Sequence, residues 1–506
     1  MKRYPVIFIV FIALFGFLCI RLCYIAFDGN IQVSAERYSR RVDIASRRGF
    51  IYDRNGMPIA GIENGYITVV DPIRLAAADE DYIKKLAEAG GNSFPQIVEK
   101  MRKTIPFKLY TSVYYDDEYA YSVPFYVRNA AEYSSAVHII GYTNGDGIGV
   151  SGAEYYFTDF LSSHGGETYL TYQADATGSM FGGLPLIIYD DGYGGDSGIV
   201  LTLDIEMQTA VENMWKTLNL DKGAVVIADI ATGEIIVSAS FPTFDANNIA
   251  AYLDSDDGEL INRCARGFTP GSVFKIITAA AALECHSNYL YTTYDCSGEF
   301  CYANIAHGEV SMSDAFAHSC NGYFYHFIGM IGVDQLRATA EKFGIGEPNY
   351  IDVFPSGHGK LDMRVPRNAA IGQGGILCTP YEITRVICTV MNDGYFTDLH
   401  LFKGIYGITD FDYTVGEPVI GKYTASVLKR MMRAVVTDGI GQAANIDGAG
   451  GKTASAQSGQ FTGDTEIIHS WFAGYYGGYA ITVLCENARD ITAAEVFAAV
   501  VTEVKQ

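Results

Sequence analysis

Two residues in the middle of the chain have the types and the spacing of a nucleophile and its base. Ser272 and Lys275 lie three positions apart in the stretch TPGSVFKIITAAAAL, residues 269–283. The Pro270-Gly271 corner predicts that Ser272 starts a helix, where free backbone N–H groups favour developing negative charge. The spacing puts the lysine ammonium on the same helix face as the serine hydroxyl. The pair therefore predicts nucleophilic attack by a serine oxygen.

A lysine needs a lowered pKa for this role, because an ordinary lysine is protonated near neutral pH and cannot accept a serine proton. The apolar run after Lys275 predicts burial, which lowers a lysine pKa, and a second cation nearby lowers it further. Lys452, in GAGGKTASAQ (448–457), is the candidate for that cation. Thr453 and Ser455 follow it on a predicted strand, so this segment is predicted to hold a carboxylate by charge and hydrogen bonds.

A third motif lies between these two, in HSCNGYF, where Ser319 and Asn321 are separated by one residue. In a loop at the mouth of the site, the second hydroxyl can pass on a proton while the asparagine amide binds a substrate amide. The Ser-x-x-Lys spacing also occurs at Ser426 and Lys429, in TASVLKRMMRAV. There the lysine belongs to the charged face of an ordinary amphipathic helix, and no Pro-Gly corner precedes the serine.

The elements around these motifs predict a mixed α+β domain. Two strands joined near residues 231–233 are expected over 223–241, and two more, turning at Gly477-Gly478, over 466–488. A long, mainly helical middle separates them, and a final helix is expected over 491–505. We expect the first hairpin to pair with the last strands in an antiparallel sheet flanked by helices.

The first part of the chain carries no candidate catalytic residues. Asn55-Gly56 predicts a hairpin turn, and 79–105 reads as amphipathic helices. The segment YDDGYGGDSG (189–198) is rich in Gly and Asp and is predicted to be a linker. It separates an expected domain at 28–195 from a second one at 196–506.

Residues 4–27 are almost free of charge and are long enough to span a bilayer. Lys2 and Arg3 precede them, and the acidic bulk of the chain follows. The positive-inside rule therefore predicts a cytoplasmic tail at 1–3, a single membrane anchor and an extracytoplasmic remainder. A cleaved signal peptide is the alternative, but no A-x-A site follows the apolar run, which favours a retained anchor.

Composition limits the remaining function classes. The net charge of -22 argues against a surface that binds the phosphate backbone of nucleic acids. Ten cysteines are too few for a disulfide scaffold in 506 residues. Cys296 and Cys301 are the closest pair outside the anchor, and we find no His-Cys cluster with zinc spacing around them. Free thiols and a disulfide both remain open for this pair, and neither a metal nor a cofactor is expected.

The three motifs together resemble those of penicillin-binding proteins and serine β-lactamases. They are Ser272-x-x-Lys275, Ser319-x-Asn321 and the Lys452-Thr453 strand. Further stretches, among them RRGFIYDRNG, LTLDIEMQTAVE, GQGGILCTPYEI and HSWFAGYY, are similar to the monofunctional, class B penicillin-binding proteins. The resemblance extends from the anchor to the final helix. It implies a membrane-anchored, elongated pedestal followed by a transpeptidase domain with a serine β-lactamase-like fold.

By this resemblance the chain is a D,D-transpeptidase of peptidoglycan synthesis and a target of β-lactams. Ser272 attacks the D-Ala-D-Ala carbonyl of a stem peptide, Lys275 is the base, Ser319 relays a proton to the leaving amine, and Asn321 orients substrate and base. The terminal carboxylate is gripped by Lys452, Thr453 and Ser455. The resemblance also implies a partner, a membrane glycan polymerase of the shape, elongation, division and sporulation (SEDS) type.

One position departs from the family pattern of Lys-Thr-Gly, because Ala454 stands in place of the glycine. A methyl group pointing into the cleft is expected to crowd a substrate that lies along the strand. Two alternatives therefore stay open. One is a wall-synthesis scaffold with weakened turnover. The other is a β-lactamase or β-lactam sensor, against which Cys320 speaks because it replaces the aspartate of a Ser-Asp-Asn motif.

Overall fold

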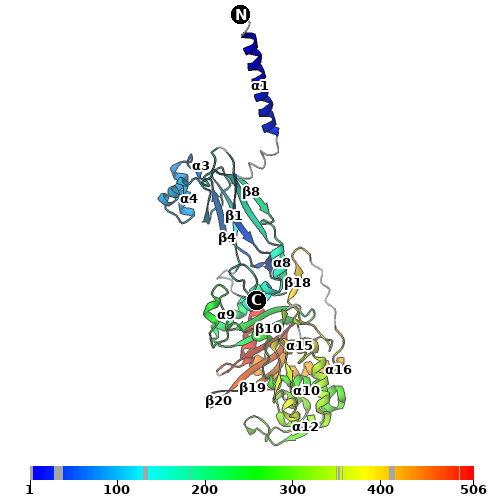
Figure 1. Ribbon diagram of the computed structural model, residues 1–506. Helices are drawn as coiled ribbons and strands as arrows, with labels where there is room; N and C mark the ends of the chain where they lie inside the picture. Colours follow the sequence, from blue (N-terminus) through cyan, green and yellow to red (C-terminus); the bar gives the residue numbers. More distant parts are fainter. Residues whose placement is uncertain are drawn as a thin grey trace. The chain divides into compact units, whose positions relative to one another are not determined.

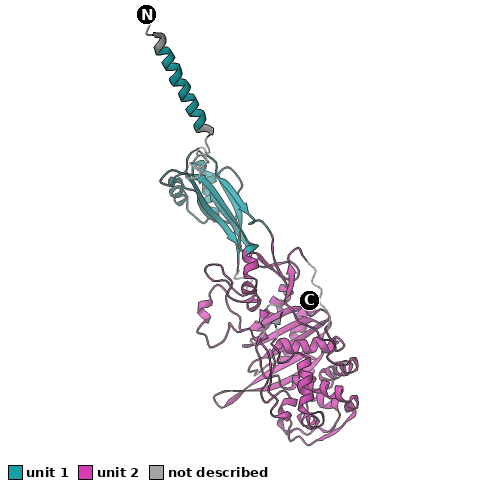
Figure 2. Ribbon diagram, turned by 45° about the vertical axis from the view of Figure 1, so that its right-hand side comes forward, with its two compact units in different colours: residues 1–48, 62–127, 163–195 teal, residues 49–61, 128–162, 196–506 magenta. Residues whose placement is uncertain are grey.

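The structure is a computed structural model in which most of the chain is described. The described residues are 4–27, 38–128, 135–182, 184–348, 350–351, 354–355, 357–408, 416–488 and 490–505. They divide into two compact units (Figure 2): residues 1–48, 62–127 and 163–195 in the first, and residues 49–61, 128–162 and 196–506 in the second. The second unit thus takes in two segments, 49–61 and 128–162, that the sequence alone had grouped with the preceding domain.

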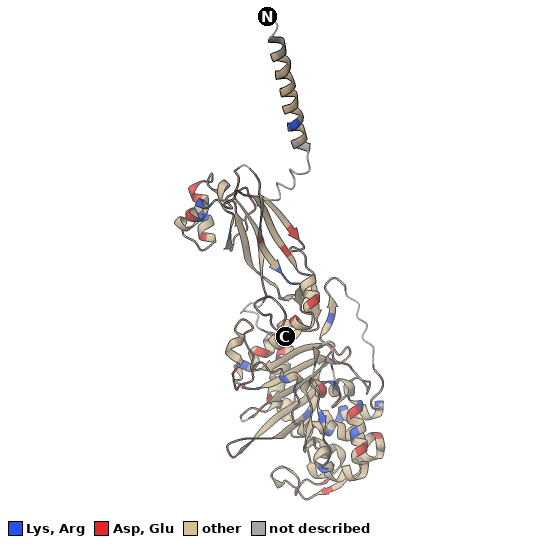
Figure 3. Cartoon of the chain, viewed as in Figure 1, with Lys and Arg blue, Asp and Glu red and all other residues tan. Residues whose placement is uncertain are grey.

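The N-terminal helix α1 (Tyr4–Phe27) is 24 residues long. Its window Ile7–Tyr24 has a mean hydropathy of 2.5. Figure 3 shows that this helix carries little charge, and Arg21 is the charged residue of its sequence. By length and composition the helix is able to cross a membrane.

The first unit contains two antiparallel three-stranded sheets, β1-β7-β8 and β5-β4-β6. One core cluster takes Ile44 from β1, Leu170 from β7 and Ile67 from β4. The elements of this unit are β1 (Ser39–Arg47), β4 (Ile62–Val70), α3 (Pro72–Leu75), α4 (Glu80–Ala89), α5 (Phe94–Arg102), β5 (Phe107–Thr111), β6 (Ala120–Val127), β7 (Gly166–Gln173) and β8 (Ile187–Asp191).

The expected helices over 79–105 are confirmed as α4 and α5, and Asp79 caps the first by accepting a hydrogen bond from the Tyr82 N–H at 2.6 Å. The predicted linker at 189–198 is different in the structure. Its first residues belong to β8, and Tyr193 is 2% exposed and donates its hydroxyl hydrogen to the Pro124 carbonyl at 2.6 Å. The prediction of a linker from composition was wrong because one buried aromatic ring, that of Tyr193, anchors an otherwise polar stretch.

The second unit is built on a five-stranded antiparallel sheet of order β11-β10-β21-β20-β19. The predicted pairing of the first hairpin with the last strands is confirmed, since β10 lies between β11 and β21. Gly233 closes the first hairpin with a φ of 79°, which favours glycine. The strands are β10 (Gly223–Asp229), β11 (Ile235–Phe241), β19 (Gly450–Thr462), β20 (Thr465–Tyr476) and β21 (Tyr479–Cys485).

Helices cover both faces of this sheet (Figure 1). Alternation along β10 separates two cores: Ala224 and Val226 face one cluster, while Val225 and Ile227 face the other. Helices α9 and α17 pack on the second face, and α15 and α16 pack on the first, with α10 behind them. The core of the larger cluster therefore surrounds the segment that carries Ser272 and Lys275.

The remaining elements of the second unit complete this core. The helices are α6 (Val137–Ile140), α7 (Gly152–Tyr156), α8 (Thr158–Ser163), α9 (Ile205–Thr217), α10 (Lys275–Cys285), α11 (Met312–Ala317), α12 (Asn321–Ile331), α13 (Val333–Lys342), α14 (Pro366–Ala370), α15 (Pro380–Met391), α16 (Lys422–Thr437) and α17 (Ala493–Val504). The short strands are β2 (Phe50–Tyr52), β3 (Pro58–Ala60), β9 (Gly198–Leu201), β12 (Tyr294–Cys296), β13 (Gly308–Val310), β14 (Tyr350–Ile351), β15 (Phe354–Pro355), β16 (Lys360–Leu361), β17 (Ile376–Leu377) and β18 (Phe402–Ile405).

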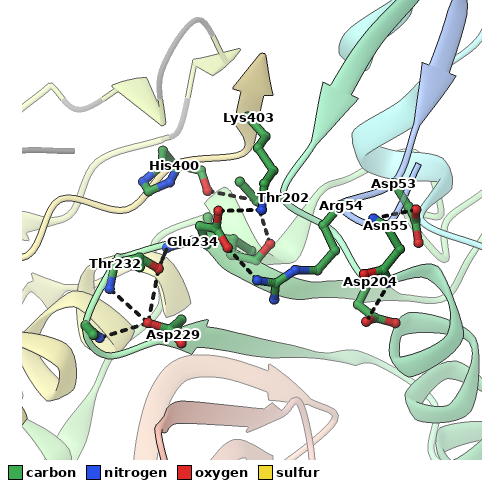
Figure 4. A network of polar contacts seen from close by, with 12 residues as sticks. Asp53, Arg54, Asn55, Thr202, Asp204, Asp229, Thr232, Glu234, His400 and Lys403 are labelled. Atoms are coloured by element: carbon green, nitrogen blue, oxygen red, sulfur yellow. Dashed lines mark hydrogen bonds and ion pairs between the residues drawn. The ribbon is translucent and has the colours of Figure 1, made fainter. Parts of the chain in front are cut away.

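A second sheet, β18-β9-β2-β3, joins residues 49–61 to this unit, and the predicted Asn55-Gly56 turn lies between β2 and β3. Figure 4 shows Glu234 between two cations beside that turn. Its carboxylate, 8% exposed, accepts hydrogen bonds from Arg54 at 2.6 Å and Lys403 at 2.9 Å. This nearly buried charge is stabilised because both neighbouring cations donate to it.

Candidate active site

Ser272 lies in a short 3-10 turn, η4 (Gly271–Phe274), that leads directly into α10. The sequence predicts a helix start at this point, and the structure places the serine one turn earlier, with Lys275 as the first α-helical residue. Gly271 has a φ of 55° and donates its N–H to the Gly372 carbonyl at 3.0 Å. Two residues earlier, the Thr269 carbonyl accepts a hydrogen bond from the Trp471 indole N–H at 3.0 Å. Two hydrogen bonds therefore hold the backbone just before Ser272.

Lys275 is fully buried, as the apolar run predicts. Its Nζ donates to the Ser319 carbonyl at 2.9 Å, to the Ser319 hydroxyl at 3.2 Å and to Oδ1 of Asn321 at 2.7 Å. Burial lowers the pKa of Lys275 to about 7. The neutral Lys275 amine still has two N–H donors for Ser319 and Asn321. It also has a lone pair, so near neutral pH it can accept the proton of a hydroxyl group.

Lys452 reaches the same hydroxyl from the sheet. It is fully buried, and its Nζ donates to Ser319 Oγ at 3.1 Å and to the Thr453 carbonyl at 3.0 Å. Burial and repulsion from Lys275 hold the pKa of Lys452 well below its usual range. The two lysines therefore do meet, and Ser319 Oγ is the atom that both Nζ atoms contact.

The Ser319-Cys320-Asn321 segment runs into the N-terminus of α12. Ser319 has a φ of 56°, a left-handed conformation that is uncommon for a residue with a side chain. Asn321 donates its Nδ2 hydrogen to the Phe300 carbonyl at 3.2 Å, and its Oδ1 is the acceptor for Lys275. Hydrogen bonds at its oxygen and at its nitrogen therefore orient the Asn321 amide. The sequence did not predict the contact with Phe300, because the two residues are 21 positions apart.

β19 is an edge strand of the main sheet and packs against η4. Along it Lys452 and Ala454 are buried, Thr453 is half-buried and Ser455 is exposed. The Thr453 Oγ1 is buried and finds no hydrogen-bond partner among the described residues. A buried hydroxyl without a partner costs free energy, so this atom is prepared for an incoming group.

The Ala454 methyl group packs toward η4, on the strand face that also carries Lys452. It is 6% exposed and belongs to the large core cluster. A side chain on Gly271 would lie 3.4 Å from this methyl group and 3.0 Å from that of Ala456. Because Gly271 has no side chain, the Ala454 methyl group fits between β19 and η4. This geometry does not support the crowding of substrate that the sequence predicts.

The second Ser-x-x-Lys pair is structural, as predicted. Ser426 and Lys429 lie in the middle of α16, where the serine hydroxyl donates to the Tyr423 carbonyl at 2.7 Å. The Lys429 ammonium donates to an Asp393 carboxylate oxygen at 2.8 Å. A paired, charged lysine on an amphipathic helix cannot act as a base for that serine.

Comparison with known proteins agrees with this geometry. The profile of the Penicillin binding protein transpeptidase domain matches residues 223–502, more than half of the chain. The chain belongs to this family. The stretch that matches contains the three motifs identified in the sequence, from Ser272 in η4 to Lys452 in β19.

Named relatives and solved structures are similar over most of this transpeptidase chain. Peptidoglycan D,D-transpeptidase MrdA of Escherichia coli K12 is 25% identical, covering 73% of this chain and 68% of MrdA. Stage V sporulation protein D of Bacillus subtilis is 27% identical, covering 89% and 76%. A structure of a peptidoglycan synthase complex that coordinates polymerization and crosslinking shares the fold with a TM-score of 0.70, at 23% identity, covering 100% and 98%. A D,D-transpeptidase domain from Eggerthella lenta has a TM-score of 0.62, at 21% identity, covering 91% and 98%.

Proposed function

We propose that this chain is a serine D,D-transpeptidase that cross-links peptidoglycan stem peptides and is acylated by β-lactams. The observation that carries the proposal is the meeting of three separate motifs at one hydroxyl, Ser319 Oγ, which both Lys275 and Lys452 contact. Family membership and relatives named peptidoglycan D,D-transpeptidase support the same reaction.

The first half of the reaction forms an ester. Neutral Lys275 accepts the hydroxyl proton of Ser272 while Ser272 Oγ attacks the carbonyl carbon of the penultimate D-Ala. The peptide C–N bond breaks, and the proton reaches the leaving D-Ala amine through Ser319, which lies between the two lysines. An amine from a neighbouring strand then attacks the ester, gives its proton back by the same route and releases Ser272.

Binding groups are assigned from the edge strand. The terminal carboxylate of the substrate is held by Lys452, Thr453 and Ser455. It gives the Thr453 hydroxyl a hydrogen-bond partner, which this hydroxyl does not have among the described residues. Backbone N–H groups of Ser272 and Ser455 stabilise the oxyanion, an effect of about 3 kcal/mol for one donor. Asn321 orients the substrate amide and the Lys275 amine.

The remaining chain serves to place this site. We assign residues 1–3 to a cytoplasmic tail, 4–27 to a membrane anchor, 28–195 to an extracytoplasmic pedestal and 196–506 to the transpeptidase domain. Segments 49–61 and 128–162 of the pedestal range belong to the same compact unit as the transpeptidase domain. A transpeptidase needs new glycan strands, so a membrane glycan polymerase of the SEDS type is the proposed partner. The similarity in fold to a peptidoglycan synthase complex supports that assignment.

The test is labelling of the full chain in detergent with a fluorescent penicillin, followed by mass spectrometry of the labelled peptide. We expect one adduct on Ser272 that is absent in Ser272→Ala. Ser426→Ala is the matched control and keeps the label, because Ser426 has the same spacing from a lysine but lies on α16. Folded protein that takes no label on Ser272 at high drug concentration would refute the proposal.

A further inference from the structure

A cation that the proposed reaction does not use lies beside the Ser319-x-Asn321 motif. It is Arg367, an exposed residue near the start of α14. Its guanidinium lies over the ring of Phe300, 5.7 Å from the ring centroid. The Phe300 carbonyl in turn accepts the Asn321 amide hydrogen at 3.2 Å. A single residue therefore separates Arg367 from the amide that is proposed to orient the substrate.

Two connections fix α14 close to the nucleophile. The helix packs against α12, which begins at Asn321. In the loop that follows α14, the Gly372 carbonyl accepts the N–H of Gly271, the residue before Ser272, at 3.0 Å. A side chain on Gly372 would lie 2.3 Å from the Gly271 carbonyl oxygen, so this close approach requires glycine. The segment that carries Arg367 therefore belongs to the immediate surroundings of Ser272.

Aromatic rings hold the Arg367 side chain in place. The Phe300 ring packs against the Tyr325 ring, with the two centroids 5.4 Å apart. A guanidinium over a ring is attracted by the negative charge of the ring face. Burial raises the pKa of the Tyr325 hydroxyl, and the nearby charge of Arg367 opposes that rise. This contact uses only the flat face of the guanidinium, so the N–H donors at its edge remain for another group.

The chain itself does not supply that group among the described residues, where no carboxylate forms an ion pair with Arg367. Acidic side chains are plentiful, at 58 against 36 basic ones. Arg364, three positions earlier, has an 84% exposed side chain and still pairs with the Asp362 carboxylate at 2.6 Å. Arg367 therefore presents a planar set of donors suited to an anionic group from a ligand.

A permanent charge distinguishes Arg367 from the two active-site lysines. Burial lowers the pKa of Lys275 to about 7. Burial and repulsion from Lys275 hold the pKa of Lys452 well below its usual range. A guanidinium, in contrast, keeps its proton at every physiological pH. An anionic group that approaches the site beside Phe300 is therefore attracted by Arg367.

We propose that Arg367 is a specificity-determining residue, which binds a carboxylate that the acceptor strand carries next to its attacking amine. The inference rests on the proposed transpeptidase function. There the donor stem peptide is held along β19 by Lys452, Thr453 and Ser455, so the groups beyond Asn321 are left for the second strand. An arginine and a carboxylate form two parallel hydrogen bonds, which fix the orientation of the acceptor. The preferred acceptor is thus an amine whose own carbon bears a free carboxylate.

This contact serves the second half of the reaction, in which the Ser272 ester is cleaved by the amine. The neutral amine attacks the ester carbonyl carbon, a C–N bond forms and the bond to Ser272 Oγ breaks. The proton that the amine loses returns to Ser272 Oγ through Lys275 and Ser319. The carboxylate bound to Arg367 takes no part in these bond changes. It lowers the entropic cost of bringing the amine to the ester.

The test compares two acceptors, D-alanine with a free carboxylate and D-alaninamide without one. Full chain in detergent is acylated by a synthetic thioester donor, and chromatography measures how the acyl group partitions between each amine and water. We expect Arg367→Gln to lower transfer to D-alanine about five- to tenfold and to leave transfer to D-alaninamide within about twofold. The two amines also differ in basicity, so the criterion is the change between wild type and variant.

Arg364→Gln is the matched control, because Arg364 lies on the same segment and is already paired with Asp362. It is expected to leave both partition ratios unchanged. Arg367→Lys keeps a charge but loses the planar donors, and transfer to D-alanine is expected to fall between the wild type and Arg367→Gln. Acylation of Ser272 by fluorescent penicillin is expected to stay within about twofold in all three variants, which also shows that they are folded.

The outcomes separate this inference from the proposed function. A wild-type chain that forms no acyl-enzyme on Ser272 refutes the transpeptidase assignment and the acceptor site with it. Normal acylation, together with a loss in Arg367→Gln that is equal for both amines or absent for both, overturns the acceptor site alone. Slower acylation by the thioester in Arg367→Gln with unchanged partition overturns it as well, because the bound carboxylate would then belong to the donor.

Discussion

Replacing Ala454 by glycine restores the family pattern of Lys-Thr-Gly, and the structure predicts a loss of stability rather than a gain of activity. The methyl group is 6% exposed and packs against η4 opposite Gly271. Its removal costs about 0.8 kcal/mol of buried apolar surface. A glycine in the strand costs about 0.5–1 kcal/mol more in backbone entropy. The expected loss in the free energy of unfolding is therefore about 1.5 kcal/mol.

Tryptophan fluorescence during urea unfolding is the assay, because both tryptophans, Trp215 and Trp471, are buried in the second unit. Trp471 is also the residue paired with Ala454 across the β19–β20 ladder. With an m-value of about 3 kcal/mol per M, the midpoint falls by about 0.5 M. The rate constant for penicillin acylation is expected to stay within about threefold of the wild type, a difference of less than about 1 kcal/mol.

Ala456→Gly is the matched control for this prediction. Ala456 is fully buried on the same strand face and also packs toward Gly271, so its loss of stability is expected to be similar. An acylation rate that rises more than about tenfold in Ala454→Gly but not in Ala456→Gly would refute the reasoning. It would show that the Ala454 methyl stands in the path of the substrate, as the sequence alone suggested.

Two further predictions concern charge. Because burial lowers the pKa of Lys275 to about 7 and only the neutral amine accepts the serine proton, we expect the acylation rate constant to level off at higher pH and to fall about tenfold per pH unit below that pKa. A rate that is flat between pH 5 and pH 8 would contradict Lys275 as the base. Glu234→Gln leaves Arg54 and Lys403 without a common carboxylate and is expected to cost about 1–3 kcal/mol in urea unfolding. Asp257→Asn, which removes a largely exposed carboxylate paired with Lys222, is expected to cost less than about 1 kcal/mol, and equal losses in the two variants would contradict the argument.

Much of the site was predictable because its reactive residues lie in short segments whose neighbouring residues determine their local structure. The Pro-Gly corner before Ser272, the apolar run after Lys275 and the strand that follows Lys452 each depend on neighbouring residues. Local alternation and turn residues also predicted the hairpin that closes at Gly233 and the antiparallel sheet. The buried state of Lys275 followed from the same reasoning, since an unbroken apolar run has to lie inside a core.

Tertiary structure decided which of these segments meet and where their side chains point. Lys452 contacts Ser319 across 133 positions of sequence, and His307 and Cys320 join Cys296 only through a hairpin and a helix terminus. The inward direction of the Ala454 methyl depends on the packing of β19 against η4. Sequence determined the types of the reacting groups because bonding chemistry belongs to single residues. Their convergence required the fold, because sheet order and helix packing are set by the sum of many contacts between distant segments.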